Sequence, residues 1–331
     1  MFRRSIFLIV GFLFLFSLTG CKTERDEAEP TAEPVFVVDF AESDSETELP
    51  PTTELPPEEE INKLPEEAPV EQTEGNEETE LPSSEPLLSE LSEEELVLYM
   101  ENKYGHRTVR TFGENIEGVY TSIDTNQKII ALTFDACGGV HGSGYDEELI
   151  TYLIEMSIPA TLFVNRRWME ENKEVMKMLA QNDLFEIENH GYAHKPLSVD
   201  GRSAYGIKGT EGIKDVIDEI MMNQEAIASF TGRSPIYFRS GTAHYDDIAL
   251  DILNELDLKA VNFDVLGDAG ATFNKEQMIR SARGVKNGSI ILYHMNHPHR
   301  EIAEAIKTVV PMLMDMGYDF VKLSDYDDYL K

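Results

Sequence analysis

The sequence predicts an α/β fold with a parallel β-sheet and helical crossovers. Short apolar runs typical of strands alternate with amphipathic stretches typical of helices from residue 128 onward. The predicted strands are 128–135, 158–164, 185–189, 235–239, 258–265, 289–295 and 319–323. The predicted helices are 146–156, 169–181, 211–230, 245–256, 275–284 and 300–316. About 235 residues with this alternation suit a single β/α barrel, and a doubly wound open sheet is the alternative.

Composition divides the chain into an acidic first part and a more ordinary second part. The net charge is −34 over 331 residues, but residues 22–95 alone hold 26 acidic and 3 basic side chains, and 10 of the 15 prolines. Such runs repel themselves and bury little, so we expect residues 21–95 to form a disordered tether. Residues 96–331 should form the domain, with its core at 128–325 and with 96–127 bracing it. The acidic surface argues against nucleic acid or anionic lipid as a partner.

The first residues have the pattern of a secretory signal, predicted over 1–20. Arg3 and Arg4 precede a short apolar run that ends at Leu18, and Thr19-Gly20-Cys21 follows it. A cysteine in this position resembles the bacterial lipobox, which implies that Cys21 is lipidated and anchors the chain on the extracytoplasmic face of the cell membrane. An ordinary signal peptide or an uncleaved anchor is the alternative. Lipidation would leave Cys137 as the only free thiol.

Polar side chains gather at the C-terminal ends of the predicted strands. In a parallel β/α fold those ends meet at one mouth, where the chemistry takes place. His190 and His194, at i and i+4, can point the same way if the chain turns helical after its strand, and neutral imidazoles are common ligands of zinc-like metals. We therefore expect a metal site at this mouth. The strand-end residues are Asp135, Asn189 with His190, Arg239, Asp264 to Asp268, and His294.

Asp135 and Cys137 close the first predicted strand, and two glycines follow them. This order is typical of a carboxylate aimed into a site with a tight turn behind it. Asp146 is better placed than Asp135 to cap the next helix. Cys137 invites a nucleophile hypothesis. Nothing nearby in the sequence would lower its pKa, so the role we expect is that of a small buried thiol.

Four motifs occur in a fixed order: TFDACGG at 133–139, NHGYAH at 189–194, FRSG at 238–241 and ILYH at 291–294. In this order they resemble the polysaccharide deacetylases with a NodB-homology domain, which are of the carbohydrate esterase type. The resemblance implies an incomplete seven-stranded (β/α) barrel that removes acetyl groups with one divalent metal ion, for which we expect zinc. It covers the barrel and no part of the tether.

The resemblance also implies roles for particular residues. Two carboxyl groups and two basic side chains would carry the acid–base chemistry, and histidines would bind the metal. The implied roles are Asp135 as the base, His190 and His194 as metal ligands, Arg239 as the group that steadies the base, His294 as the acid, and Asp268 as the counterpart of the family's fourth motif.

The sequence departs from the family pattern in ways that define a divergent branch. Ala136 stands where the family has a metal-binding aspartate, and Gly191 stands where it has a hydroxyl residue. Asp135 could itself bind the metal, and Asp146 or His141 could replace the missing ligand. Two histidines with water alone would hold a catalytic metal less firmly than three protein ligands.

These features predict a metal-dependent hydrolase that removes acetyl groups from N-acetylated sugars of a cell-envelope or exported polysaccharide, acting on carbon–nitrogen bonds other than peptide bonds. The alternative is a catalytically impaired surface lipoprotein that only binds glycan on the same barrel. A glycosidase ranks last, because it needs a pair of carboxylates and only Asp135 has a strong claim at the mouth. The sequence does not identify the glycan.

Overall fold

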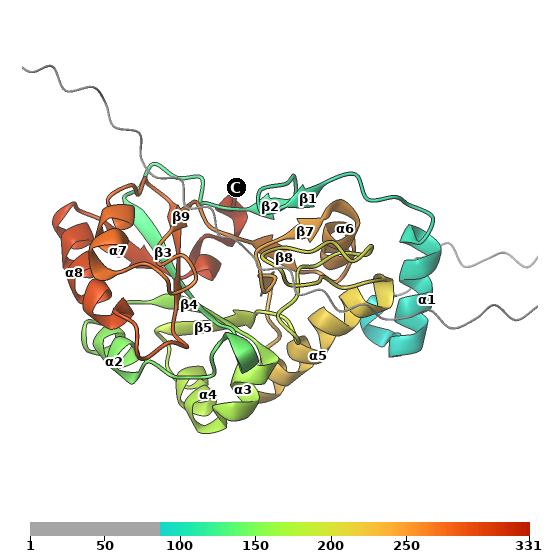
Figure 1. The fold of residues 1–331 in the computed structure, drawn as a ribbon, viewed down its shortest axis with the longest axis horizontal. Helices are drawn as coiled ribbons and strands as arrows, with labels where there is room; N and C mark the ends of the chain where they lie inside the picture. The colour runs from blue at the N-terminus through green and yellow to red at the C-terminus, as the bar shows by residue number, and fades with distance from the viewer. Residues whose placement is uncertain (1–86) are drawn as a thin grey trace, which may run out of the picture. The chain divides into compact units, whose positions relative to one another are not determined.

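A computed structural model describes residues 87–331, in which a parallel sheet forms the centre (Figure 1). Its strands follow the order β2-β8-β6-β5-β4-β3-β10-β9, and β11 pairs with the first half of β3, ahead of the point where β4 joins it. The strands of this sheet are β2 (Val119–Tyr120), β3 (Ile129–Ala136), β4 (Ala160–Val164), β5 (Phe185–Asn189), β6 (Tyr237–Phe238), β8 (Lys259–Val261), β9 (Val265–Leu266), β10 (Ser289–His294) and β11 (Asp319–Val321).

Helices cover the outside of the sheet (Figure 1). Helices α2, α7 and α8 pack together beside β3 and β10, and α5 packs against β5. The helices are α1 (Glu93–Tyr104), α2 (Glu147–Glu155), α3 (Arg166–Glu171), α4 (Lys173–Ala180), α5 (Ile213–Thr231), α6 (Asp247–Glu255), α7 (Lys275–Ala282) and α8 (Ile302–Asp315). A separate antiparallel pair joins β1 (Phe112–Gly113) to β7 (Tyr245–Asp246).

The short connection between β8 and β9 shows that the sheet curls into an incomplete barrel. Strand β9 ends the sheet on one side, and β8 lies next to the opposite end, beside β2. Only residues 262–264 join them, and four steps of extended chain reach at most about 14 Å. The two ends of the sheet must therefore lie close together, although no ladder pairs them among the described residues. This confirms the predicted incomplete (β/α) barrel over the open, doubly wound alternative.

The central strand β3 shows how side-chain alternation sorts the core from the site. All of its residues are buried, as expected for a parallel strand covered on both faces. Phe134 and Ala136 belong to the apolar cluster packed under the helices. The odd-numbered residues of β3 point to the opposite face, into the barrel. There Ala131 joins a second apolar cluster and Asp135 reaches the mouth.

All seven predicted apolar runs contain a strand, and two predicted elements divide. The run 258–265 gives both β8 and β9, because residues 262–264 cross the gap between the sheet ends. The helix predicted at 169–181 becomes α3 and α4, since Asn172 leaves helical geometry and its side-chain amide donates to the Ser143 carbonyl at 3.0 Å.

The segment predicted to brace the barrel contains α1, which packs against α5. This helix begins at Glu93, ahead of the predicted boundary at 96, because Ser92 caps it. The predicted signal segment, Cys21 and the tether up to residue 86 lie outside the described residues. Within 87–331, no helix has the length and apolar character needed to cross a membrane.

Candidate active site

A buried ion pair between Asp135 and Arg239 lies at the mouth of the barrel. Arg239 follows β6 and is fully buried, and its Nη1 donates to Asp135 Oδ1 at 2.8 Å and to Thr133 Oγ1 at 3.0 Å. The rest of the guanidinium donates to two main-chain carbonyls, with Nε bound to Val261 at 2.9 Å and Nη2 to Asn262 at 3.0 Å. Charge and directional bonds therefore hold one oxygen of Asp135 and leave the other facing the site.

Aromatic rings flank the guanidinium of Arg239. The Phe163 ring centroid lies 4.0 Å from its Cζ, and the Phe263 centroid lies 5.8 Å away. A delocalised cation is attracted to ring faces when it is removed from water. These contacts, together with the carbonyl bonds, help to offset the cost of burying this charge.

His190 and His194 meet at the mouth, although the chain between them is not helical. Residues 190–194 form an irregular loop after β5, and the two imidazole rings meet edge to face with centroids 5.0 Å apart. The expectation that a helical turn would bring them together was wrong. His190 Nδ1 donates to the Arg239 carbonyl at 2.8 Å, which leaves Nε2 with its lone pair toward the site.

The carboxylate of Glu219, on α5, shapes this loop from behind. Its oxygens accept the main-chain N–H groups of Ala193 at 2.8 Å and Lys195 at 3.2 Å. Gly191 has a φ of 76°, and a Cβ there would clash with Glu219 Oε1. The positive φ and the close approach of the Glu219 carboxylate therefore both favour glycine at the family's hydroxyl position. Glu219 was not among the residues predicted from the sequence, although an acidic residue on the apolar face of a predicted helix was a usable signal.

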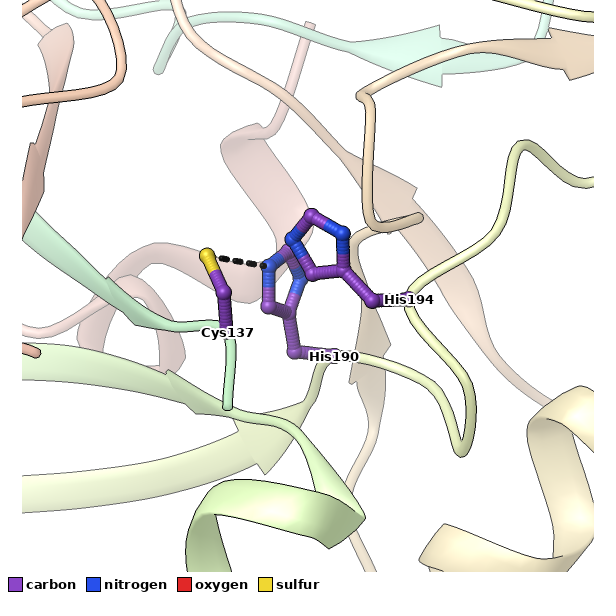
Figure 2. Close-up of side chains that lie close together, drawn as sticks. All are labelled: Cys137, His190 and His194. Carbon is purple, nitrogen blue, oxygen red and sulfur yellow. Dashed lines mark hydrogen bonds between the residues drawn. The ribbon is translucent and has the colours of Figure 1, made fainter. Parts of the chain in front are cut away.

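Cys137 joins the two histidines, as Figure 2 shows. Its Sγ lies 3.8 Å from His190 Nε2, and one donor atom from each of Cys137, His190 and His194 falls within 4.8 Å of the others. Burial alone would raise the pKa of the Cys137 thiol. The positive field of His194 and hydrogen bonds between the sulfur and His190, His194 and His294 instead hold this pKa well below its ordinary value. Residues nearby in the sequence did not predict this lower pKa, because the histidine neighbours of Cys137 are distant in sequence.

These three residues fit a divalent metal ion. All three are buried, and His194 Nδ1 has no hydrogen-bond partner within residues 87–331, an arrangement that normally costs free energy. Burial opposes a positive charge on His190, yet the Asp135 carboxylate and Cys137 raise the pKa of its imidazole, so the surroundings favour a cation. Imidazole and thiolate are the donors that zinc and similar metals prefer.

His294 and Asp268 form a second pair at the mouth. His294 ends β10 and lies beside Asp135 in the register of β10 and β3. Its Nδ1 contacts Asp268 Oδ1 at 2.9 Å, and its main-chain N–H donates to Asp268 Oδ2 at 2.7 Å. Burial would lower the pKa of His294, but the Asp268 carboxylate raises it well above its ordinary value. Asp268, matched from an irregular motif, thus holds the imidazole, leaving Nε2 free of that bond.

Several residues considered from the sequence lie elsewhere or differ in role. Asp146 caps α2 by accepting from the Leu149 N–H at 3.0 Å, so it is not a replacement ligand. Asp264 accepts from the Ile290 N–H at the start of β10, away from the mouth. His141 stacks on His194 with ring centroids 4.6 Å apart but is not part of the three-residue cluster. Asp135 also lies outside that cluster, so its ligation of a metal stays a prediction.

The mouth opens into a cavity of about 620 Å³. Asp135, Cys137, His194 and His294 line its floor, and exposed apolar side chains lie at its rim. The rim residue Tyr205 is 73% exposed, and its hydroxyl donates to Glu114 Oε1 at 2.6 Å. The sequence offered no periodic signal for Tyr205, which lies in a loop. The other apolar rim residues are Val140 and Leu266.

Residues 122–261 match the sequence model of the polysaccharide deacetylase family. The matched region includes Asp135, Cys137, both metal-site histidines and Arg239, and it ends before Asp268 and His294. Two proteins of Bacillus subtilis (strain 168) are similar to parts of this chain. The uncharacterized protein YlxY is 25% identical over 178 residues, which cover 54% of this chain and 51% of YlxY. The peptidoglycan-N-acetylmuramic acid deacetylase PdaC is 24% identical over 212 residues, which cover 63% of this chain and 41% of PdaC.

A solved structure is similar in fold. A CE4 family pseudoenzyme from Bacillus anthracis superposes with a TM-score of 0.54 at 20% identity, covering 64% of this chain and 69% of that chain. Residues 122–261 thus have the sequence pattern of a polysaccharide deacetylase domain, on a barrel shared with such proteins. The chain spans about half or less of the length of the two Bacillus subtilis relatives.

Proposed function

We propose that this chain is a metal-dependent hydrolase that removes acetyl groups from an N-acetylated polysaccharide. One observation carries the proposal. An arginine-held carboxylate, Asp135, and an aspartate-held imidazole, His294, lie side by side at the end of β3 and β10, beside a cluster of metal-type donors. A protein that only binds glycan has no need for a fixed base and a fixed acid at one mouth.

Each side chain has a distinct task in the proposed reaction. A divalent ion, when bound through His190 and His194, supplies a Lewis acid that polarises the acetamide carbonyl and acidifies water. Asp135, oriented by Arg239, takes one proton from the attacking water. The new carbon–oxygen bond forms at the carbonyl carbon, and the carbon–nitrogen bond then breaks. His294 Nε2 gives a proton to the leaving sugar nitrogen, so the products are acetate and a free amine.

The cavity supports a sugar substrate. Apolar and aromatic side chains at a rim suit the apolar faces of pyranose rings, while a polar floor suits the acetamide. The similarity to a deacetylase named for peptidoglycan N-acetylmuramic acid supports an envelope glycan as substrate. We further propose that the chain reaches such a glycan from the extracytoplasmic face of the membrane, through a lipid on Cys21 and the acidic tether.

The decisive measurement is acetate release from peptidoglycan and from chitin oligomers, with and without a chelator. We expect chelator-sensitive release. Asp135→Asn and His294→Gln should each lower turnover by about 10²–10⁴-fold, the usual range for general acid–base assistance. His299→Gln is the matched control, because His299 is exposed beyond the mouth, and it should behave as wild type. Glycan binding with no acetate release in the wild-type protein would instead identify a binding module.

A further inference from the structure

We propose that Cys137 is a metal ligand, and that its sulfur completes, with His190 and His194, a three-residue site that selects zinc-like ions. This inference rests on the proposed metal dependence but not on the proposed substrate. It assigns a role to the residue that follows the position where the family's metal-binding aspartate is replaced by alanine.

Strand parity explains why the sulfur, and not the side chain before it, reaches the site. Ala136 ends β3 with its methyl group in the apolar cluster under the helices. Side chains two residues apart on a strand point to the same face. Cys137 follows Asp135 by two residues, and both line the cavity. A ligand at 137 therefore points into the mouth, whereas Ala136 lies on the opposite face.

The surroundings of the sulfur match a metal site in three independent respects. The donor atoms of the three residues lie within 4.8 Å of one another, a spread that a central ion can bridge. His190 is already fixed through its Nδ1–H bond to the Arg239 carbonyl, the usual support of a metal-bound imidazole. His194 Nδ1 is buried without a partner among the described residues. Sulfur with two imidazoles is a zinc-type donor set and a poor one for magnesium or calcium.

The competing role for Cys137 is that of a nucleophile activated by His294 and Asp268. A nucleophilic thiol needs one base, and such a role leaves the convergence of His190 and His194 on the same sulfur unexplained. It also leaves the unpaired nitrogen of His194 unexplained. A metal ion accounts for both observations at once.

The test is cobalt binding by the full chain after metal removal, read by absorbance. A thiolate bound to Co²⁺ gives a charge-transfer band in the near ultraviolet, which oxygen and nitrogen ligands do not give. We expect this band in the wild-type protein, with one ion per chain, and its loss in Cys137→Ser. The affinity of Cys137→Ser for zinc should fall by more than about 100-fold, the upper end of the losses seen for supporting residues. Cys21→Ser is the matched control, because it removes the only other cysteine, and it should keep the band.

A second readout needs no change at position 137. In the Cys21→Ser protein, zinc should slow alkylation of the remaining thiol by iodoacetamide by at least tenfold, whereas magnesium should not.

Cys137→Asp should bind metal again but without the band. A band that persists in Cys137→Ser, or alkylation that zinc leaves unchanged, overturns the inference. Full metal content in Cys137→Ser with loss of acetate release also overturns it, in favour of a nucleophile. These readouts use no glycan. They can therefore support Cys137 as a metal ligand even if no acetate is released, and acetate release can be observed even if Cys137 binds no metal.

Discussion

Glu219 places a pH-sensitive charge behind the loop that carries His194. It is 3% exposed and accepts two main-chain N–H groups from that loop. Burial raises the pKa of Glu219 from its ordinary value of 4.5 to about 7, even though these two hydrogen bonds favour the ionised form. The perturbation we consider is Glu219→Gln, which keeps the shape of the side chain and removes the charge.

The sign of the effect follows from proton linkage. Between pH 4.5 and 7 the folded protein holds a proton on Glu219 that the unfolded chain has lost. The contribution of Glu219 to stability is therefore complete below pH 4.5 and declines as the pH rises through 7. Raising the pKa of Glu219 from 4.5 to about 7 corresponds to about 3 kcal/mol of unfolding free energy in all. About 2–3 kcal/mol of this stabilisation is lost between pH 5 and pH 8. Glutamine at 219 loses one acceptor oxygen, a pH-independent cost of about 1 kcal/mol.

The assay is urea unfolding followed by the fluorescence of Trp168, the only tryptophan of the chain and fully buried. The difference in unfolding free energy between Glu219→Gln and wild type should move by about 2–3 kcal/mol in favour of the variant from pH 5 to pH 8. Glu225→Gln, at an exposed site on the same helix, controls for loss of one acid and should track wild type at every pH. A difference for Glu219→Gln that stays constant with pH would refute the reasoning.

Three further substitutions probe the rest of the site. Arg239→Met should lower the unfolding free energy by about 3–5 kcal/mol, because it leaves Asp135 buried without its cation, and Asp135→Asn in the same chain should recover part of that loss in urea unfolding. Gly241→Ala should cost about 1–3 kcal/mol and weaken zinc binding, because its Cβ would overlap the main chain of His194; unchanged zinc affinity by competition titration would contradict this. Asp268→Asn should lower the pH at which half of His294 is protonated, as read from its imidazole resonance by NMR, and a resonance that titrates as in wild type would count against the pairing.

The strands could be predicted because each depends on a short stretch of sequence, whereas the acid–base residues were implied by the order of motifs along the chain. Strand β3 is an uninterrupted apolar run, and β10 is another, so both were predicted as buried strands of a parallel sheet, whereas their places beside each other were not. The pairing of Arg239 with Asp135 was implied by the family resemblance in motif order. The same resemblance gave Asp268 and His294 as separate site residues, and their contact was not predicted.

The roles of Cys137 and Glu219 could not be predicted in the same way. Each depends on contacts between segments far apart in the chain: Cys137 meets His190 across 53 residues, and Glu219 meets Ala193 across 26. The irregular loop at 190–194 could not be predicted from hydrophobic periodicity either, because the positive φ of Gly191 and of His194 leaves no trace in the hydrophobic pattern. Spacing alone therefore predicted that His190 and His194 meet, but it predicted the wrong local structure for the chain between them.

Residues 262–264, which connect β8 to β9, couple closure of the barrel to assembly of the active site. The carbonyls of Val261 and Asn262 hold the guanidinium of Arg239, and Asp264 binds the start of β10. Until β8 and this crossing are in place, Arg239 lacks two of its four hydrogen-bond partners, the carbonyls of Val261 and Asn262, and Asp135 is paired with a cation that is less firmly held. A chain whose barrel has not closed would thus be inactive as well as unstable. Insertions that the rim loops tolerate should not be tolerated here, because they would displace Asn262 from Arg239 or Asp264 from the start of β10.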